Sequence, residues 1–384
     1  MSKQWMSVPV AAAAVALTLT SCASSPANKS GAVSGASGTA NVATATSAAA
    51  VGGMDALIAA AKKEGALNVI ALPRDWTNYG ALLDGFATRY GIKINSANPD
   101  GSSADEMTAI TSLKSQVRAP DVVDVGQSFA LSGAKMGLYA PYQVATWASI
   151  PAGLKDFNGL WANDYGGYIS IGCDVSKVAK CPTTLAALDD PAYKGKVALN
   201  GDPTKANAAF SAVWAAALAN GGSFGDIHPG IAFFAKLKQA GVYVPVQASA
   251  ATVASGETPI VLDWDYLNAT KADGLKAKGR TFSVAVPSDG HFSAYYAQAI
   301  SKYAPHPAAA RLWEEYLYSV RGQNGWLKGY GRPVELPALV SAKTVDAVYA
   351  AKLPTVEGTP VFPTADQTSA AKAVVTQQWS SAVK

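Results

Sequence analysis

The stretch PIVLDWDYLN, residues 259–268, places chemically active side chains directly after a short apolar run. Residues 259–262 have the length and the β-branched content of a buried strand. The next four residues are two acids and two aromatic residues, Asp263, Trp264, Asp265 and Tyr266. Open α/β sheets bind ligands at the carboxyl ends of their strands, so this stretch predicts the floor of a binding cleft. The alternative interpretation makes Asp263 a turn cap and Trp264 a core residue.

Strands and helices alternate along the body of the chain, which predicts two α/β units. The first unit has strand-like runs over 68–72, 91–97 and 120–126, with amphipathic helical segments between them. A second set of strands and helices begins near residue 165 and includes a strand over 280–287. No sequence period of 20 to 50 residues repeats, which argues against a solenoid.

The amino terminus has the pattern of an export signal. Lys3 is followed by an apolar run, Val8 to Leu19, which is shorter than the roughly 20 residues needed to span a bilayer. The ending LTSC resembles a bacterial lipoprotein signal, which implies cleavage after residue 21 and acylation of Cys22. Residues 22–53 are nearly all Ala, Ser, Gly and Thr after the cysteine, so we expect a flexible tether to the outer face of the cell membrane.

Charge and cysteine content limit the partners of the chain. It carries 31 basic and 27 acidic residues, a net charge of +4, without a basic cluster, which argues against nucleic acid. Cys173 and Cys181 form an even pair, and in an oxidising compartment we expect them to join, with a stabilisation of about 2–3 kcal/mol. A zinc site is the rival reading, but two further ligands are missing nearby.

Three stretches together resemble the extracellular solute-binding proteins of bacterial ABC importers, in the branch that binds iron(III), thiamine and polyamines. They are AAKKEGALNVIALPRDWTNYGALLDGF, VASGETPIVLDWDY and AISKYAPHPAAARLWEEYLYSVRGQNGWLKGYGRPV, and the last is the most specific. The resemblance implies a two-lobed, type 2-like periplasmic-binding-protein fold in which two crossover strands, near 166–171 and 294–300, act as the hinge. Lobe 1 is then expected over 54–167 and 295–384, and lobe 2 over 168–294.

The same resemblance implies that a small solute binds between the lobes and is delivered to a permease and its ATPase subunit. The chain is then expected to work as a monomer without a cofactor. Because Trp and Tyr faces and carboxylates both attract organic cations, we predict a polyamine-like or thiamine-like ligand. The expected ligand-binding residues are Trp76, Tyr79, Ser102, Gln127, Asp202, Trp264, Asp265, Tyr266 and Tyr295.

Two other ligands, iron(III) and a zwitterion, and one other class of protein, a hydrolase, are the alternatives. Iron(III) suits the phenols of Tyr295 and Tyr296, although neighbouring residues on a strand point to opposite faces. A zwitterion such as an aminophosphonate suits Arg74, Arg332 and the helix that starts after Pro203. A hydrolase is not expected, because GGSFG at 221–225 follows a helix, whereas a nucleophile elbow follows a strand.

Overall fold

The computed structural model describes residues 41–354, 356 and 362–383. The chain from Ala40 to Lys384 forms one compact unit with two lobes. Cys22, the expected signal peptide and most of the expected tether lie outside the described residues. None of the described helices is long and apolar enough to cross a membrane.

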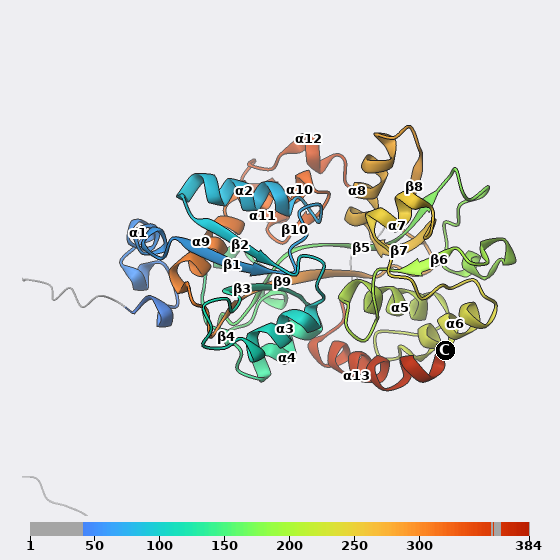
Figure 1. Ribbon diagram of the computed structural model, residues 1–384, viewed down its shortest axis with the longest axis horizontal. Coiled ribbons are helices and arrows are strands. Elements are labelled where there is room, and N and C mark those ends of the chain that lie inside the picture. The colour runs from blue at the N-terminus through green and yellow to red at the C-terminus, as the bar shows by residue number, and fades with distance from the viewer. Residues whose placement is uncertain (1–40, 355, 357–361, 384) are drawn as a thin grey trace, which may run out of the picture. The chain divides into compact units, whose positions relative to one another are not determined.

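The first lobe contains the described chain up to about residue 161 and the helices between residues 307 and 350 (Figure 1). Its elements are α1 Met54–Glu64, β1 Ala66–Ile70, α2 Tyr79–Tyr90, β2 Lys93–Ala97, α3 Ser103–Ser112, β3 Val122–Gly126, α4 Gln127–Lys135, β4 Tyr139–Ala140, α9 Pro307–Leu317, α10 Val320–Lys328, β10 Arg332–Pro333, α11 Leu336–Ser341 and α12 Ala347–Ala350. The expected strand–helix alternation is therefore confirmed. Gly65 ends α1 at φ +74, where a residue without a side chain is favoured.

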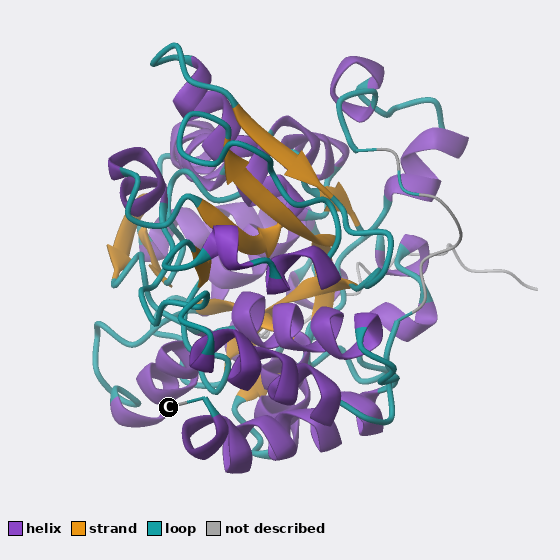
Figure 2. Ribbon diagram, turned by 90° about the vertical axis from the view of Figure 1, so that its right-hand side faces the viewer, coloured by secondary structure: helices purple, strands orange, loops and turns teal. Residues whose placement is uncertain are grey.

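The second lobe is built from the middle of the chain. Its elements are β6 Val197–Leu199, α5 Asn207–Ala219, α6 His228–Gln239, α7 Ala250–Ser255, β7 Ile260–Trp264, α8 Asp265–Lys276 and β8 Phe282–Ala285. Helices flank the strands on both sides (Figure 2). The sulfur atoms of Cys173 and Cys181 lie within bonding distance, with their Cα atoms 5.8 Å apart, which is the geometry of a disulfide.

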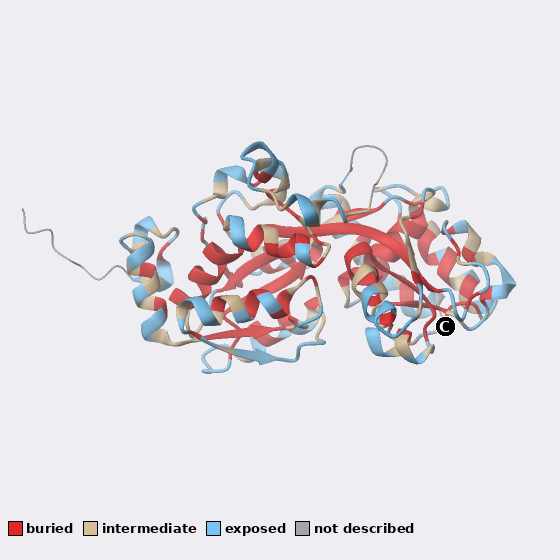
Figure 3. Cartoon of the chain, turned by 90° about the horizontal axis from the view of Figure 1, so that it is seen from above, coloured by how far each residue is buried: buried red, intermediate tan, exposed pale blue. Residues whose placement is uncertain are grey.

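Two long strands, β5 Ala162–Asp174 and β9 Ser293–Ser301, run through both lobes. They pair antiparallel with each other inside an eight-stranded sheet whose main order is β3-β9-β5-β7-β6. The first part of β5 pairs with β9, and its last part pairs with β7 and β8. Every residue of β5 is buried, as the strands crossing between the lobes in Figure 3 show. The two expected crossover strands are thus confirmed.

The predicted tether ends at residue 53, but the folded unit begins earlier in the chain. Residues 42–44 and 49–51 form short 3-10 helices that pack near α1 and α9. Arg311 of α9 is buried and donates to the carbonyls of Ala43 and Ala45 at 2.9 and 2.8 Å. Residues 41–53 therefore belong to the folded unit, because their backbone satisfies a buried guanidinium.

The carboxyl-terminal helix α13, Ala365–Ala382, was expected in the first lobe, but it does not belong to that lobe alone. It packs against α4 of the first lobe and α6 of the second, and in Figure 1 it runs from beside α4 along the lower edge of the second lobe. Its Trp379 ring meets Phe234 of α6 at 5.6 Å. The Lys372 ammonium lies 4.8 Å from the ring of Phe129 and 5.1 Å from that of Phe210, one ring from each lobe. The helix therefore forms a third connection between the lobes.

Lys372 gives this connection a pH dependence. Burial lowers the pKa of Lys372 to about 8 from its usual 10.5, against the attraction of Asp202. Between pH 8 and 10.5 the unfolded chain therefore holds more protons than the folded one, so stability rises with pH. Relative to Lys372→Met, the wild type should gain up to about 1.4 kcal/mol per pH unit in this window. Urea unfolding of both proteins across the window measures the gain, and parallel curves would contradict it.

Candidate functional site

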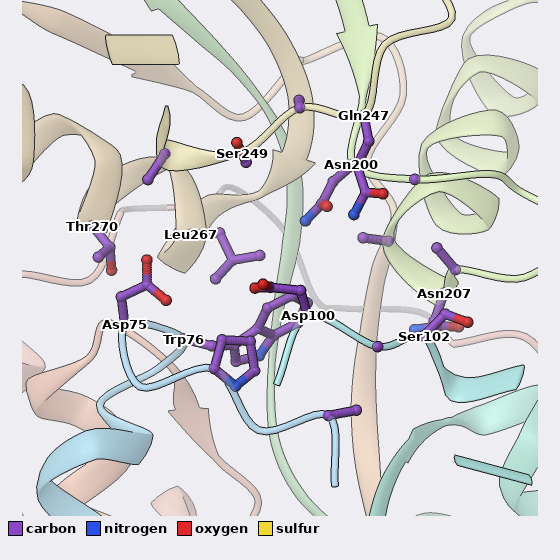
Figure 4. Close-up of a pocket in the computed structure, with 18 of the residues that line it drawn as sticks. Asp75, Trp76, Asp100, Ser102, Asn200, Asn207, Gln247, Ser249, Leu267 and Thr270 are labelled. Atoms are coloured by element: carbon purple, nitrogen blue, oxygen red, sulfur yellow. The ribbon is translucent and has the colours of Figure 1, made fainter. Parts of the chain in front are cut away.

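A cavity of about 630 Å³ lies between the two lobes. The first lobe contributes the segments 71–79 and 100–106 with Asp124, and the second lobe contributes 200–208, 247–254 and part of α8. Figure 4 shows Asp75 and Trp76 from the first lobe and side chains such as Asn200 from the second around the same space. The cavity therefore depends on both lobes, as expected for a ligand held between them.

Trp76 forms an aromatic wall of the cavity. Its indole N–H donates to the Tyr165 hydroxyl at 2.7 Å, and its ring lies 5.6 Å from that of Tyr296 in an edge-to-face arrangement. The loop that carries Trp76 turns through Thr77 at φ +44, and Gly329 packs directly on it. A Cβ at position 329 would lie 2.3 Å from the Thr77 carbonyl carbon, so only glycine permits this approach. Packing from the distant α10 end thus fixes the position of the indole.

Asp124 in the middle of β3 places a buried carboxylate in the cavity wall. Its Oδ2 accepts hydrogen bonds from the hydroxyls of Tyr79 and Tyr165 at 2.7 and 2.8 Å. Its Oδ1 has no partner among the described residues. Burial raises the pKa of Asp124 to about 7, although the two tyrosine hydrogen bonds lower it. An unpaired, desolvated carboxylate oxygen beside aromatic rings is suited to an ammonium group.

Asp263, by contrast, is neutralised by the protein itself. Lys271 of α8 donates to its Oδ2 at 2.6 Å, and Asn200 lies 3.2 Å from the same oxygen. Asp263 is fully buried and the Lys271 side chain is 8% exposed, so water screens this ion pair little. Lys271 and Asn200 line the cavity, but the Asp263 charge is already compensated.

Four of the nine residues expected from the sequence lie in the cavity wall: Trp76, Tyr79, Ser102 and Asp202. Ser102 also caps α3, in a capping box with Asp105. Asp202 accepts hydrogen bonds from the amide and hydroxyl of Thr204, both at 2.8 Å. Both side chains therefore shape the loops of the cavity in addition to facing it.

The three central residues of the opening stretch do not line the cavity. Trp264 and Tyr266 are fully buried, with stacked rings 6.1 Å apart. Asp265 is the first residue of α8, and its carboxylate accepts from Arg332 at 2.5 Å and from the amides of Tyr168 and Tyr266 at 3.0 Å. The structure therefore places these residues outside the cavity wall, because a helix begins at residue 265 and Arg332 of β10 occupies the Asp265 carboxylate.

Gln127 and Tyr295 are also outside the cavity wall. Gln127 starts α4 and accepts from the Asn163 amide at 3.0 Å. Tyr295 packs against Phe362 with ring centroids 5.6 Å apart. Strand alternation places Tyr296, the next residue of β9, at the cavity instead. Only one of the two tyrosines faces the cavity, as strand alternation predicts. It is Tyr296 and not the expected Tyr295.

Several cavity residues were not singled out from the sequence: Asp124, Asn200, Lys205, Asn207, Gln247, Ser249 and Lys271. One signal was available for Asp124, because an acid inside the apolar run PDVVDVG is costly unless it has a role. The others stand in loops or on helices whose facing side is set by packing across the lobes.

The fold and the shared cavity define a two-lobed binding protein, and comparison with known proteins agrees. The model of the bacterial extracellular solute-binding protein family matches residues 118–357. The chain belongs to this family. No curated protein matches the sequence.

Solved structures of periplasmic binding proteins share the fold. AfuA from Actinobacillus pleuropneumoniae, with fructose-6-phosphate bound, is 18% identical with a TM-score of 0.65, over 83% of this chain and 98% of that one. Iron-bound HitA from Pseudomonas aeruginosa is 18% identical with a TM-score of 0.58, over 82% and 99%. A putative spermidine/putrescine ABC transporter protein from Listeria monocytogenes is 13% identical with a TM-score of 0.62, over 83% and 99%. At these identities the likeness concerns the fold.

Proposed function

We propose that this protein captures a small organic cation in the interlobe cavity and delivers it to the permease of an ABC importer. The observation that carries the proposal is the Oδ1 of Asp124, which has no partner within the described parts of the chain, in a cavity with the rings of Trp76, Tyr79 and Tyr296. An ammonium or thiazolium gains about 0.5–2 kcal/mol from an aromatic face, and a charged hydrogen bond adds about 1.5–3 kcal/mol. A polyamine-like or thiamine-like solute therefore suits the site, with Asp124 in the role that the sequence suggested for Asp265.

The mode of action follows from the two lobes. The solute contacts both lobes at once, so it stabilises the arrangement in which they are close, and a permease can recognise that arrangement. In this proposal Cys22 carries the lipid anchor, the monomer works at the outer face of the membrane, and the Cys173–Cys181 pair is oxidised after export. The role is binding, and an ATPase subunit supplies the energy for transport.

Iron(III) is less well supported than an organic cation. The two tyrosines that suggested it are split, with Tyr296 at the cavity and Tyr295 against Phe362. Burial raises the pKa of both phenols, which disfavours the phenolate that a ferric ion requires. The solved structures with this fold carry ligands as different as iron and a sugar phosphate, so the choice rests on the cavity.

A thermal-shift screen of the full chain tests the proposal. Putrescine, spermidine, thiamine and iron(III) citrate are the probes. We expect an amine or thiamine to raise the melting temperature, because a ligand at a hundredfold excess over its Kd stabilises by about 2.7 kcal/mol. A shift with iron(III) citrate alone, with colour in the sample, would favour the metal. No shift with an organic cation would contradict the proposal.

A further inference from the structure

The amino terminus of α5 opens into the cavity without a cap. Ala206 occupies the N-cap position and has no side-chain acceptor, and residues 206–208 line the cavity. The first hydrogen bond of the helix runs from the Phe210 amide to the Ala206 carbonyl, so the amides before Phe210 have no partner within the helix. This helix has 13 residues, and its dipole places about half a positive charge at this end. Such a terminus attracts anions.

Asn207 supplies a second, independent observation. The residue is 5% exposed, it lines the cavity, and its Nδ2 donor has no hydrogen-bond partner among the described residues. The Tyr296 hydroxyl lies close enough for the Asn207 side chain to offset part of the rise in its pKa, but no hydrogen bond joins the two groups among the described residues. Gly126 of β3 holds the Asn207 side chain in place, because a Cβ at position 126 would lie 2.1 Å from the Asn207 Cγ. A buried amide donor without a partner is costly, and an acceptor on a ligand would satisfy it.

The charged residues around this end of the cavity suit a ligand group that is a negatively charged hydrogen-bond acceptor. Lys205 lines the cavity two residues before α5. It is in no ion pair among the part of the chain that the structure describes, although its charge helps to lower the pKa of Asp105. The neighbouring acid Asp202 directs its Oδ1 to the amide and hydroxyl of Thr204. Asp105 is engaged by Ser102 in the capping box of α3.

The geometry relates this end to the proposed cation site. Asp124 and Gly126 are two residues apart on β3, so their side-chain positions share one face of the strand, separated by roughly 7 Å. Asn207 packs on Gly126. The Asp124 carboxylate and the Asn207 amide therefore lie on the same side of the sheet, within the reach of a solute whose two polar ends are a few bonds apart.

We propose that the α5 terminus, with Asn207 and Lys205, binds an oxyanion, a carboxylate or phosphonate, on the same solute whose amine binds Asp124. The substrate class is then a short zwitterion and not a polyamine. This inference rests on the proposed function and narrows it.

Binding of four probes to the full chain, measured by calorimetry, tests the inference. The probes are putrescine, 4-aminobutyrate, 2-aminoethylphosphonate and inorganic phosphate. We expect at least one zwitterion to bind at least tenfold more tightly than putrescine. Asn207→Asp places a negative charge at the same position and is compatible with a helix start, so it should weaken zwitterion binding at least tenfold. The same change at the exposed Asn158, outside the cavity, is the matched control and should have no effect.

The outcomes separate the inference from the proposed function. Putrescine binding as tightly as the zwitterions, with no effect of Asn207→Asp on any probe, overturns the inference and leaves the proposed function standing. Phosphate binding that Asn207→Asp abolishes, without binding of any amine, supports the anion subsite and overturns the cation proposal. If none of the four probes binds, the inference is wrong, and the thermal-shift screen with spermidine and thiamine decides the proposed function.

Discussion

Asp265→Ala is expected to lower the free energy of unfolding by about 3–5 kcal/mol, because it leaves the partly buried Arg332 guanidinium without its charged partner. Asp265 is fully buried, and the Arg332 side chain is 14% exposed. Arg332 also donates to the Pro354 carbonyl at 2.9 Å and lies over the Tyr168 ring at 4.8 Å. These contacts limit how far water can solvate the guanidinium. The pair joins β10 of the first lobe to the start of α8 in the second. Urea unfolding measures the loss.

Asp273→Ala is the matched control for this change, since Asp273 is an exposed acid on the same helix. Among the described residues its carboxylate accepts only from the Tyr330 hydroxyl, at 2.5 Å, and we expect a loss below about 1 kcal/mol. The double variant Asp265→Ala with Arg332→Met should recover part of the stability, because it removes both buried charges. If Asp265→Ala kept full stability and lost only ligand affinity, Asp265 would be a ligand contact after all.

Asp124→Asn is expected to weaken binding of the organic cation by about 10–150-fold, which corresponds to a charged hydrogen bond of about 1.5–3 kcal/mol. Asparagine keeps the shape of the side chain and the acceptor that faces Tyr79 and Tyr165, but it removes the charge. Isothermal titration with whichever cation binds in the screen measures the change. Asp75→Asn is the matched control, because Asp75 lines the same cavity but is exposed, and exposed charge pairs contribute only about 0–1 kcal/mol.

The affinity for the cation is expected to depend on pH, and the same variant, Asp124→Asn, tests this. Because burial raises the pKa of Asp124 to about 7, the free protein keeps this proton up to neutral pH. A cation binds the ionised carboxylate, so affinity for a permanently charged ligand should rise about tenfold per pH unit up to pH 7 and then level off. Asp124→Asn should remove this slope. A slope that persists in the variant would assign the titration to another group.

The arrangement of the fold could be predicted from local sequence, because apolar periodicity and helix stops depend on neighbouring residues. The strands around 68–72 and 120–126 and the close approach of Cys173 to Cys181 follow from such patterns, whereas the crossover strands were implied by the resemblance to a known family. The extent of the tether could not, because residues 41–53 have the composition of a linker and are held by Arg311, far along the chain. The position of α13 across both lobes is likewise set by contacts with aromatic rings that lie far away along the chain.

The sequence by itself determined that this chain has two α/β lobes joined by crossover strands and that acids and aromatic rings gather at strand ends. Only the tertiary structure decided which of these acids faces the cavity. Asp265 is paired with Arg332, 67 residues away, whereas one oxygen of Asp124 has no partner among the residues that the structure describes. The physical reason is that a carboxylate at a strand end is available to a ligand only where no distant cation or helix start already satisfies it.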